Sequence, residues 1–215
     1  MQPEPGAPIL VLGHGASGSA ASMKPHVDGL RLRGIDARAI DLPKGRAERA
    51  FPRFAALLAG GPAGGRAGGP AGGPAGGPAG RPAGDEAANA IALRLAVGGH
   101  SFGGRVASLA AADACEAGRP PLAVVLLSYP LHPPGRPDEW EARTAHWPRL
   151  TCPVILLTGT SDPFARPALL QRAVTERLPA AELVAYPRVG HGLAAVLDDA
   201  LDRVAAFVLR AASTS

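Results

Sequence analysis

The sequence predicts an α/β protein in three layers, with a mainly parallel sheet of six strands between two layers of helices. Two observations carry this prediction. Short apolar runs alternate with helical periodicity along the chain, and polar, glycine-flanked segments follow several of the runs directly. Strands that are buried on both faces are continuously apolar, as in a sheet covered by helices. The 215 residues suit one such domain, which we expect to span residues 1–215.

Six runs have the length and apolar character of buried strands. They cover residues 8–12, 35–41, 93–98, 122–128, 153–159 and 182–186. Between them, apolar residues recur at every fourth position from Leu170 to Leu178, and an apolar helical stripe begins at Leu201. Further helical segments are expected at 47–58 and 85–92. Repeated strand–helix units of this length favour parallel pairing.

Residues 60–84 repeat a four-residue unit that resembles Pro-Ala-Gly-Gly. Collagen needs glycine at every third position, so the repeat excludes a triple helix. A segment of Gly, Ala and Pro with two arginines buries too little apolar surface to offset the entropy lost on ordering. We therefore expect a disordered insertion within the domain.

Composition and charge exclude several classes of protein. The net charge of +4 comes mainly from scattered arginines, and no basic run contains interleaved aromatic residues, so we expect no nucleic-acid partner. The longest apolar stretches, such as 122–127, have about six residues, whereas a membrane span needs about 20. The first residues lack the basic start of a signal peptide. We expect a soluble, cytoplasmic protein without a membrane partner.

The two cysteines, Cys115 and Cys152, are too few for a disulfide framework. No cysteine or histidine pair has the spacing of metal ligands, so no metal site is expected. We expect both cysteines to be small apolar side chains that fill space in the core.

A candidate nucleophile follows the third run. Residues 98–104 have the sequence Gly-Gly-His-Ser-Phe-Gly-Gly and lead into a helical segment. A serine between glycines in a strand–turn–helix context is typical of a nucleophile elbow, whose strained turn exposes the hydroxyl of Ser101. Side chains at Gly99 and Gly103 would collide with neighbouring backbone. We expect His100 to point away from the site and to serve in packing.

A serine hydroxyl needs a base, and the base needs an acid that orients it. Asp162 follows the fifth run, and His191 lies between two glycines after the sixth. The chain order Ser, Asp, His, each after a strand, matches one known arrangement of the triad. The alternatives are that Asp162 is a turn residue and that His191 is an exposed loop residue.

The loop after the first run, at residues 13–18, should face Ser101 across the sheet. Ester cleavage builds negative charge on the carbonyl oxygen, which two preset backbone N–H donors stabilise. We expect these donors to be the N–H groups of Ala16 and Phe102. The expected walls of the substrate pocket are His14, Tyr129, Leu131 and Phe164, with ordinary core packing as the alternative for Tyr129, Leu131 and Phe164.

The same loop offers a rival interpretation. Gly13, Gly15 and Gly18 have the spacing of a dinucleotide-binding fingerprint, and Asp41 ends the next run, where a ribose-binding acid would lie. However, no apolar-periodic helix begins directly after Gly18, and Pro25 interrupts the segment. Pyrophosphate binding requires a helix N-terminus there, so this interpretation is the weaker one.

Together these motifs resemble the α/β-hydrolase superfamily. The resemblance lies in the loop at 14–17, the elbow at 98–105, the acid loop at 158–164 and the histidine loop at 190–193. Residues 128–135, Ser-Tyr-Pro-Leu-His-Pro-Pro-Gly, are similar to small dienelactone-hydrolase-like proteins. That branch includes the hydrolase-like subunit of the eukaryotic NSL histone acetyltransferase complex and its testis-expressed relatives.

The resemblance implies a three-layer α/β-hydrolase fold with Ser101 as nucleophile, Asp162 as acid and His191 as base, and it implies no cofactor. Dienelactone hydrolases use a cysteine nucleophile, so the lactone substrate is not carried over. The two usual leading strands are absent, which implies a minimal six-stranded sheet, and the fourth and fifth runs lie too close in sequence for a cap domain.

The expected function is hydrolysis of a small carboxylic ester or thioester through an acyl-enzyme. The alternative is a catalytically silent hydrolase fold that binds a protein partner.

Overall fold

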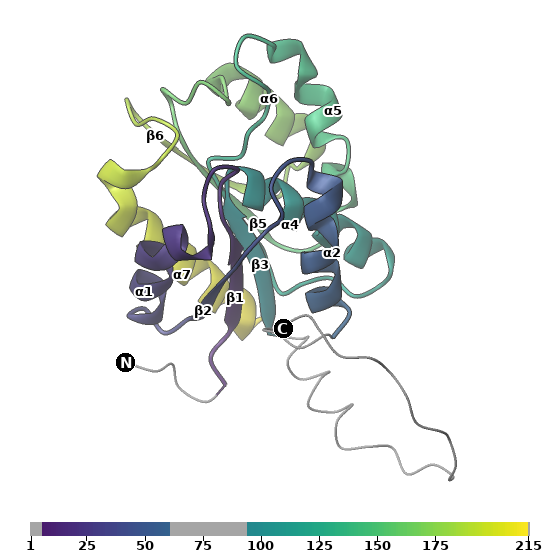
Figure 1. Cartoon of the computed structure of the whole chain (residues 1–215), viewed down its shortest axis with the longest axis vertical. Helices are drawn as coiled ribbons and strands as arrows, with labels where there is room; N and C mark the ends of the chain where they lie inside the picture. The colour runs from purple at the N-terminus through teal and green to yellow at the C-terminus, as the bar shows by residue number, and fades with distance from the viewer. Residues whose placement is uncertain (1–5, 61–93, 215) are drawn as a thin grey trace.

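Six strands form one sheet in the computed structural model, which describes residues 6–60 and 94–214 (Figure 1). The strands are β1 (Ile9–Gly13), β2 (Asp36–Ile40), β3 (Leu95–His100), β4 (Val124–Leu127), β5 (Val154–Gly159) and β6 (Glu182–Tyr186). Their order is β2-β1-β3-β4-β5-β6, and every neighbouring pair is parallel. The predicted six-stranded sheet is confirmed and is parallel throughout. Residues 61–84 of the repeat and the helical segment expected at 85–92 lie outside the described residues.

The third strand ends two residues later than the sequence predicts. Gly98 and Gly99 belong to β3 instead of ending it. A Cβ atom on Gly98 would lie 2.2 Å from the carbonyl oxygen of Val125 on β4. Glycine stands at position 98 because the backbone of β4 approaches too closely for a side chain.

Helices cover both faces of the sheet, as the apolar runs predict. The helices α2 (Ala47–Leu58), α4 (Phe102–Glu116), α5 (Trp140–Thr144) and α6 (Pro167–Arg177) contribute to the core on one face. On the other face lie α1 (Lys24–Arg31) and α7 (Leu197–Ser213). Successive strand residues alternate between the two cores: Val124 and Leu126 face the first, whereas Val125 and Leu127 face the second. This alternation explains why the strand sequence is apolar at every position.

The sequence signals at helix starts agree with the structure in two cases and mislead in one. Pro167 is the first residue of α6, and Asp198 and Asp199 lie in the first turn of α7. Pro25, which was expected to interrupt the chain after the first loop, instead lies in the first turn of α1. Proline is tolerated there because that N–H has no partner within the helix.

The connection between β4 and β5 contains no cap domain. Throughout residues 128–153, all of which the structure describes, the helical elements are α5 and two single turns at Pro137–Glu139 and Trp147–Arg149. In the described part of the chain, no helix is both long enough and apolar enough to cross a membrane.

The strand order places a topological switch point between β1 and β3. The chain moves outward from β1 to β2 and then crosses back over β1 to β3 on its other side. In parallel sheets, ligands bind where adjacent connections leave in opposite directions, at the carboxyl ends of the strands. The loop after β1 and the turn after β3 border this crevice.

Candidate active site

Ser101 forms a sharp turn between β3 and α4. Its backbone has φ 52° and ψ −114°, a strained conformation for a residue with a side chain. Its N–H donates to the carbonyl of Leu127 at 2.8 Å. A Cβ atom on Gly103 would lie 2.2 Å from the carbonyl oxygen of Gly13, so the turn packs directly against the end of β1. The strain and the glycine contact expected of a nucleophile elbow are both present.

Asp162 and His191 are hydrogen bonded to each other. The Nδ1–H of His191 donates to Oδ2 of Asp162 at 2.7 Å, and the carboxylate has no exposed surface. The other oxygen, Oδ1, accepts from the N–H of Phe164 at 2.8 Å. Because both oxygens are engaged, the carboxylate has a fixed orientation. A proton on Nδ1 leaves Nε2 of His191 as the acceptor.

Backbone contacts join the loops that carry these two residues. Thr160 N–H donates to the carbonyl of Tyr186, and Ser161 N–H donates to that of Val189, each at 2.9 Å. A Cβ atom on Gly159 would lie 2.0 Å from the Val189 carbonyl oxygen. The glycine that precedes the acid loop thus allows the histidine loop to lie directly against it.

Ser101 and His191 face one cavity of about 510 Å³. The other lining residues are the loop 15–18 after β1, Ser22, Met23, His26, His100, Phe164 and Gly192. None of them is a lysine, arginine or carboxylate. The Ser101 side chain makes no hydrogen bond to any described residue, so its hydroxyl is free to rotate within the space that it shares with the imidazole.

Two backbone N–H groups beside Ser101 have no acceptor. Phe102 is the first residue of α4, where an N–H has no partner within the helix. Ala16 lies in the loop after β1, and neither N–H donates to another group within the described residues. A Cβ atom on Gly15 would lie 4.0 Å from the Cβ of Ser101, so this loop borders the elbow. Free donors on both sides of a serine suit a developing oxyanion.

His100 does not point away from the site, contrary to expectation. Its side chain lines the cavity, and Nε2–H donates to the carbonyl of His191 at 2.9 Å. The two imidazole rings meet edge to face, with centroids 5.0 Å apart. Burial lowers the pKa of His100, so this residue is a neutral donor near neutral pH. His100 therefore fixes the backbone of His191 while Asp162 fixes its ring.

Part of the cavity wall comes from a segment that sequence reasoning missed. Met23 ends a 3-10 turn, Ala20–Met23, and His26 lies in the first turn of α1, the helix that Pro25 was expected to interrupt. Burial, with repulsion from His100, lowers the pKa of His26 to about 4. Its Nδ1 has no hydrogen-bond partner in the described structure, so the wall offers an unused polar atom.

Among the four expected pocket residues, only Phe164 lines this cavity. Its ring packs against that of His191, with centroids 4.6 Å apart. Tyr129 and Leu131 lie in the core under α4 and α5, where Tyr129 O–H donates to the carbonyl of Arg143 at 2.6 Å. Expecting these two residues at the pocket was wrong, because the chain after β4 turns inward and not toward the cavity.

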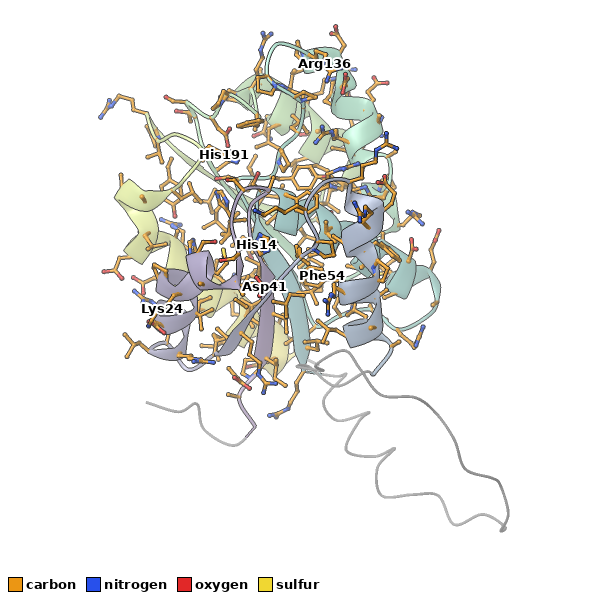
Figure 2. All side chains as sticks on the ribbon, viewed as in Figure 1. His14, Lys24, Asp41, Phe54, Arg136 and His191 are labelled. Carbon is orange, nitrogen blue, oxygen red and sulfur yellow. The ribbon has the colours of Figure 1, made fainter. Side chains whose placement is uncertain are left out.

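His14 is also a structural residue and not a pocket wall. It is 2% exposed; its Nδ1–H donates to the Gly15 carbonyl, and its Nε2 accepts from the N–H of Leu42 at 3.0 Å. Figure 2 shows it beside Asp41, whose Oδ1 lies 3.9 Å from Nε2. His14 thus ties the loop after β1 to the segment after β2.

The dinucleotide interpretation lacks its main structural requirement. A single turn of 3-10 helix, Ala20–Met23, follows Gly18, and α1 begins only at Lys24. No helix N-terminus therefore lies at the glycine loop, where a pyrophosphate would need it. Asp41 Oδ1 accepts a hydrogen bond from the N–H of Ala20 at 2.7 Å.

A second serine–histidine pair lies inside the protein. Ser108 Oγ and His146 Nε2 are 2.8 Å apart, and the two residues are 0% and 5% exposed. Burial, with repulsion from Arg105 and Arg149, lowers the pKa of His146 to about 3. No carboxylate of a described residue contacts this imidazole. The pair joins the middle of α4 to the segment before β5, and it lines none of the described cavities.

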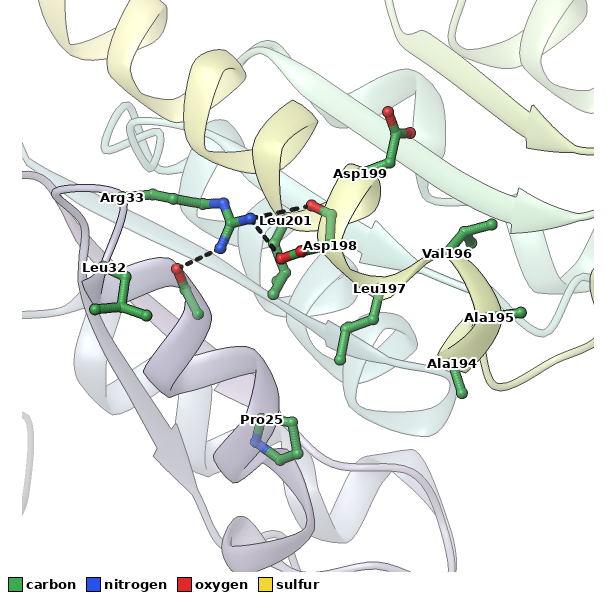
Figure 3. Close-up of a pocket in the computed structure, with 11 residues that line it drawn as sticks. Pro25, Leu32, Arg33, Ala194, Ala195, Val196, Leu197, Asp198, Asp199 and Leu201 are labelled. Atoms are coloured by element: carbon green, nitrogen blue, oxygen red, sulfur yellow. Dashed lines mark hydrogen bonds and ion pairs between the residues drawn. The ribbon is translucent and has the colours of Figure 1, made fainter.

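Another cavity, of about 570 Å³, lies between α1 and the start of α7 (Figure 3). The arginine in its wall is already paired: Arg33 contacts the carboxylates of Asp198 and Asp202 at 2.7 and 2.6 Å. It contains neither a nucleophile nor an imidazole. In residues 6–60 and 94–214, no group of three His, Cys, Asp or Glu side chains could hold a metal ion.

A family model described as alpha/beta hydrolase domain matches residues 83–203. No curated protein matches the chain in sequence. Solved structures of several hydrolases are similar in fold. The monoacylglycerol lipase of Paleococcus ferrophilus has a TM-score of 0.67 at 16% identity, covering 100% of this chain and 96% of that chain.

Two further structures have comparable similarity. Native esterase 2 of Thermogutta terrifontis has a TM-score of 0.63 at 18% identity, covering 97% of this chain and 85% of that one. The thioesterase domain from the curacin biosynthetic pathway has a TM-score of 0.62 at 14% identity, covering 97% and 93%. At such identities the similarity concerns the fold alone.

Proposed function

The chain belongs to the alpha/beta hydrolase domain family, and we propose that it is a serine hydrolase that cleaves small, uncharged carboxylic esters or thioesters. One observation carries this proposal: a serine in a strained turn faces the same cavity as a histidine whose Nδ1 is bonded to a buried carboxylate. The lipase, esterase and thioesterase among the similar structures are consistent with hydrolysis of such bonds.

In the proposed mechanism, Nε2 of His191 takes the proton of Ser101 as Oγ attacks the substrate carbonyl. The tetrahedral intermediate then collapses, its bond to the leaving oxygen or sulfur breaks, and His191 delivers the proton to that atom. Water attacks the acyl-enzyme in the same way and releases the acid and free Ser101.

The surrounding groups assist by holding charge and orientation. The N–H groups of Ala16 and Phe102 stabilise the oxyanion, and loss of one such donor costs about 3 kcal/mol of barrier. Asp162 keeps the proton of His191 on Nδ1 and stabilises the imidazolium that forms. Backbone contacts that join the Asp162 loop to the His191 loop, and the elbow to the end of β1, support this arrangement.

The cavity supports the proposed class of substrate. About 510 Å³ is typical of sites for small molecules. A wall without charged side chains favours an uncharged acyl group, because nothing there would offset the desolvation of a charge.

We also propose that the protein belongs to the dienelactone-hydrolase-like branch. The segment 128–135, which carries this resemblance, has a defined structural role that supports it. His132 N–H donates to the carbonyl of Phe164, and its Nε2 accepts from the N–H of Arg166 at 3.3 Å. The segment thus holds the loop that contains Asp162.

Aryl esters and thioesters of graded acyl length test the proposal. We expect turnover of acetyl, propionyl and butyryl esters and a fall in kcat/KM of at least about ten-fold for palmitoyl esters, whose long chain and leaving group together exceed a cavity of about 510 Å³. A matched ester with a terminal carboxylate should also be a poor substrate. Absence of turnover throughout the panel would contradict the proposed activity.

The position of His100 predicts a measurable contribution to the same reaction. We expect His100→Ala to lower kcat about ten-fold with little change in KM, because His191 loses the donor to its carbonyl and its ring is less well placed. His100→Gln, which keeps an N–H donor, should recover part of that loss.

Thermal unfolding supplies the control for this pair of variants. A positioning role predicts similar Tm values for both and a difference in kcat alone. If both variants had wild-type kcat, or if kcat and Tm fell in parallel in both, His100 would be a packing residue only.

A further inference from the structure

Cys115 and Cys152, expected to be isolated space-filling residues, lie side by side. Their sulfur atoms are 3.9 Å apart, although 37 positions separate the residues in the chain. Neither is in a disulfide, and both are half-buried, so small reagents can reach them. A disulfide needs about 2.05 Å between the sulfurs, an approach of about 2 Å from this geometry.

Ion pairs next to the two cysteines hold together the elements that carry them. Cys115 lies in the last turn of α4, and Cys152 directly precedes the segment that enters β5. Arg149 pairs with Asp113 at 3.1 Å and with Glu116 at 2.6 Å, and therefore holds this segment against the end of α4. The close approach of the sulfurs follows from this anchoring.

We propose that Cys115 and Cys152 form a redox-modification site, at which a peroxide produces an intramolecular disulfide between the end of α4 and the entry to β5. The site does not depend on the proposed hydrolase activity, because it involves neither Ser101 nor His191.

The electrostatics assign different roles to the two thiols. The hydrogen bond shared with Cys152 lowers the pKa of Cys115, and hydrogen bonds with Thr151 lower it further. The pKa of Cys152 is raised by the neighbouring Cys115 and by burial. Cys115 is therefore the thiolate that reacts first, since the thiolate is the nucleophilic form.

The reaction balances with hydrogen peroxide as the oxidant. The Cys115 thiolate attacks one peroxide oxygen, the O–O bond breaks, and Cys115 becomes a sulfenic acid while hydroxide leaves and takes a proton. Cys152 then attacks the sulfenic sulfur, the S–S bond forms, and the S–O bond breaks with loss of water. In total, two thiols and one peroxide give one disulfide and two waters, and the two sulfurs supply the two electrons.

The position of the disulfide predicts an effect on stability but not on rate. Ser101 lies at the opposite end of α4 from Cys115, about 20 Å away at 1.5 Å per helical residue. Likewise, Asp162 follows the far end of β5. The cross-link restricts the unfolded chain, and we expect it to raise Tm by about 5–15 °C.

Peroxide treatment of the full chain tests the proposal. Titratable thiols should fall from two to none, with a mass loss of 2 Da in the monomer and recovery on treatment with dithiothreitol. Cys152→Ser should instead trap a sulfenic acid at Cys115 that reacts with dimedone. The matched Cys115→Ser variant should react at least about ten-fold more slowly, because Cys152 lacks thiolate character.

Three outcomes would overturn the proposal. They are two remaining thiols under conditions that oxidise free cysteine, a disulfide that joins two chains, and over-oxidation of either sulfur without loss of the other. Because the wild-type mass answers the question, the result does not depend on the folding of the serine variants. Labelling of Ser101 by an active-site reagent tests the proposed function separately.

Discussion

Replacement of Ser101 by alanine is expected to lower kcat for short-chain esters by about 10⁴-fold or more, the loss typical of removing a triad nucleophile. In the proposed mechanism the hydroxyl oxygen of Ser101 accepts the acyl group, and no other hydroxyl of the cavity wall lies in the elbow. Alanine removes one oxygen and keeps the backbone of the turn, so Tm should change little. Steady-state hydrolysis of an aryl acetate, with thermal unfolding in parallel, measures both quantities.

Ser108→Ala is the matched control for this experiment. It removes the same atom, but from a serine within α4 that contacts an imidazole in the interior. We expect turnover within a few-fold of wild type and a lower Tm, because His146 loses a buried partner. The opposite pattern, with activity lost in Ser108→Ala and kept in Ser101→Ala, would reject Ser101 as nucleophile.

Asp162→Asn is expected to lower kcat by about 10⁴-fold. The asparagine oxygen can still accept from the N–H of Phe164, but its amide NH₂ would face Nδ1 of His191. That contact favours the tautomer with the proton on Nε2, which cannot take a proton from Ser101. Tm should stay within about 3 °C of wild type, since the loop keeps its backbone hydrogen bonds.

Measuring both turnover and Tm of Asp162→Asn separates a catalytic role of this carboxylate from a structural one. A large fall in Tm with normal turnover in Asp162→Asn would make this carboxylate a structural turn residue, the alternative that the sequence left open. Asp162→Glu offers a further comparison: it keeps the charge but displaces it, so we expect intermediate activity.

Most of the fold was predictable because the apolar residues of each strand and helix lie on the faces that the fold buries. The strand β6 matches its predicted range, as does α2, and apolar continuity identified the parallel sheet. The helix α1 was missed because Pro25 suggests an interruption, and only the chain around it shows that this proline occupies a first turn. For Tyr129 and Leu131 the sequence left two options open, the pocket wall and the core, and the structure places both residues in the core.

The candidate site was predictable to the extent that it depends on strand ends. Ser101, Asp162 and His191 each follow a strand, and parallel strands bring such residues to one edge. The roles of His14 and His100 depend on which way a side chain points from a turn, and the sequence does not encode that direction locally. Gly15 did offer a signal, since a Cβ atom there would lie 3.2 Å from Nδ1 of His100.

The contact between Cys115 and Cys152 could not be predicted from the sequence. Spacing rules detect disulfides and metal sites when many cysteines occur together, and two residues 37 positions apart give no such signal. Their proximity arises from the packing of α4 against the segment that precedes β5, which includes the Arg149 ion pairs.

Covalent labelling with a fluorophosphonate tests the central claim most directly, because the reagent reacts with a serine only where a base activates it. The account predicts one adduct per chain, mapped to the peptide that contains Ser101, absent in Ser101→Ala and greatly slowed in Asp162→Asn. An adduct that persists in Ser101→Ala, or no adduct on the folded wild-type protein, would contradict it.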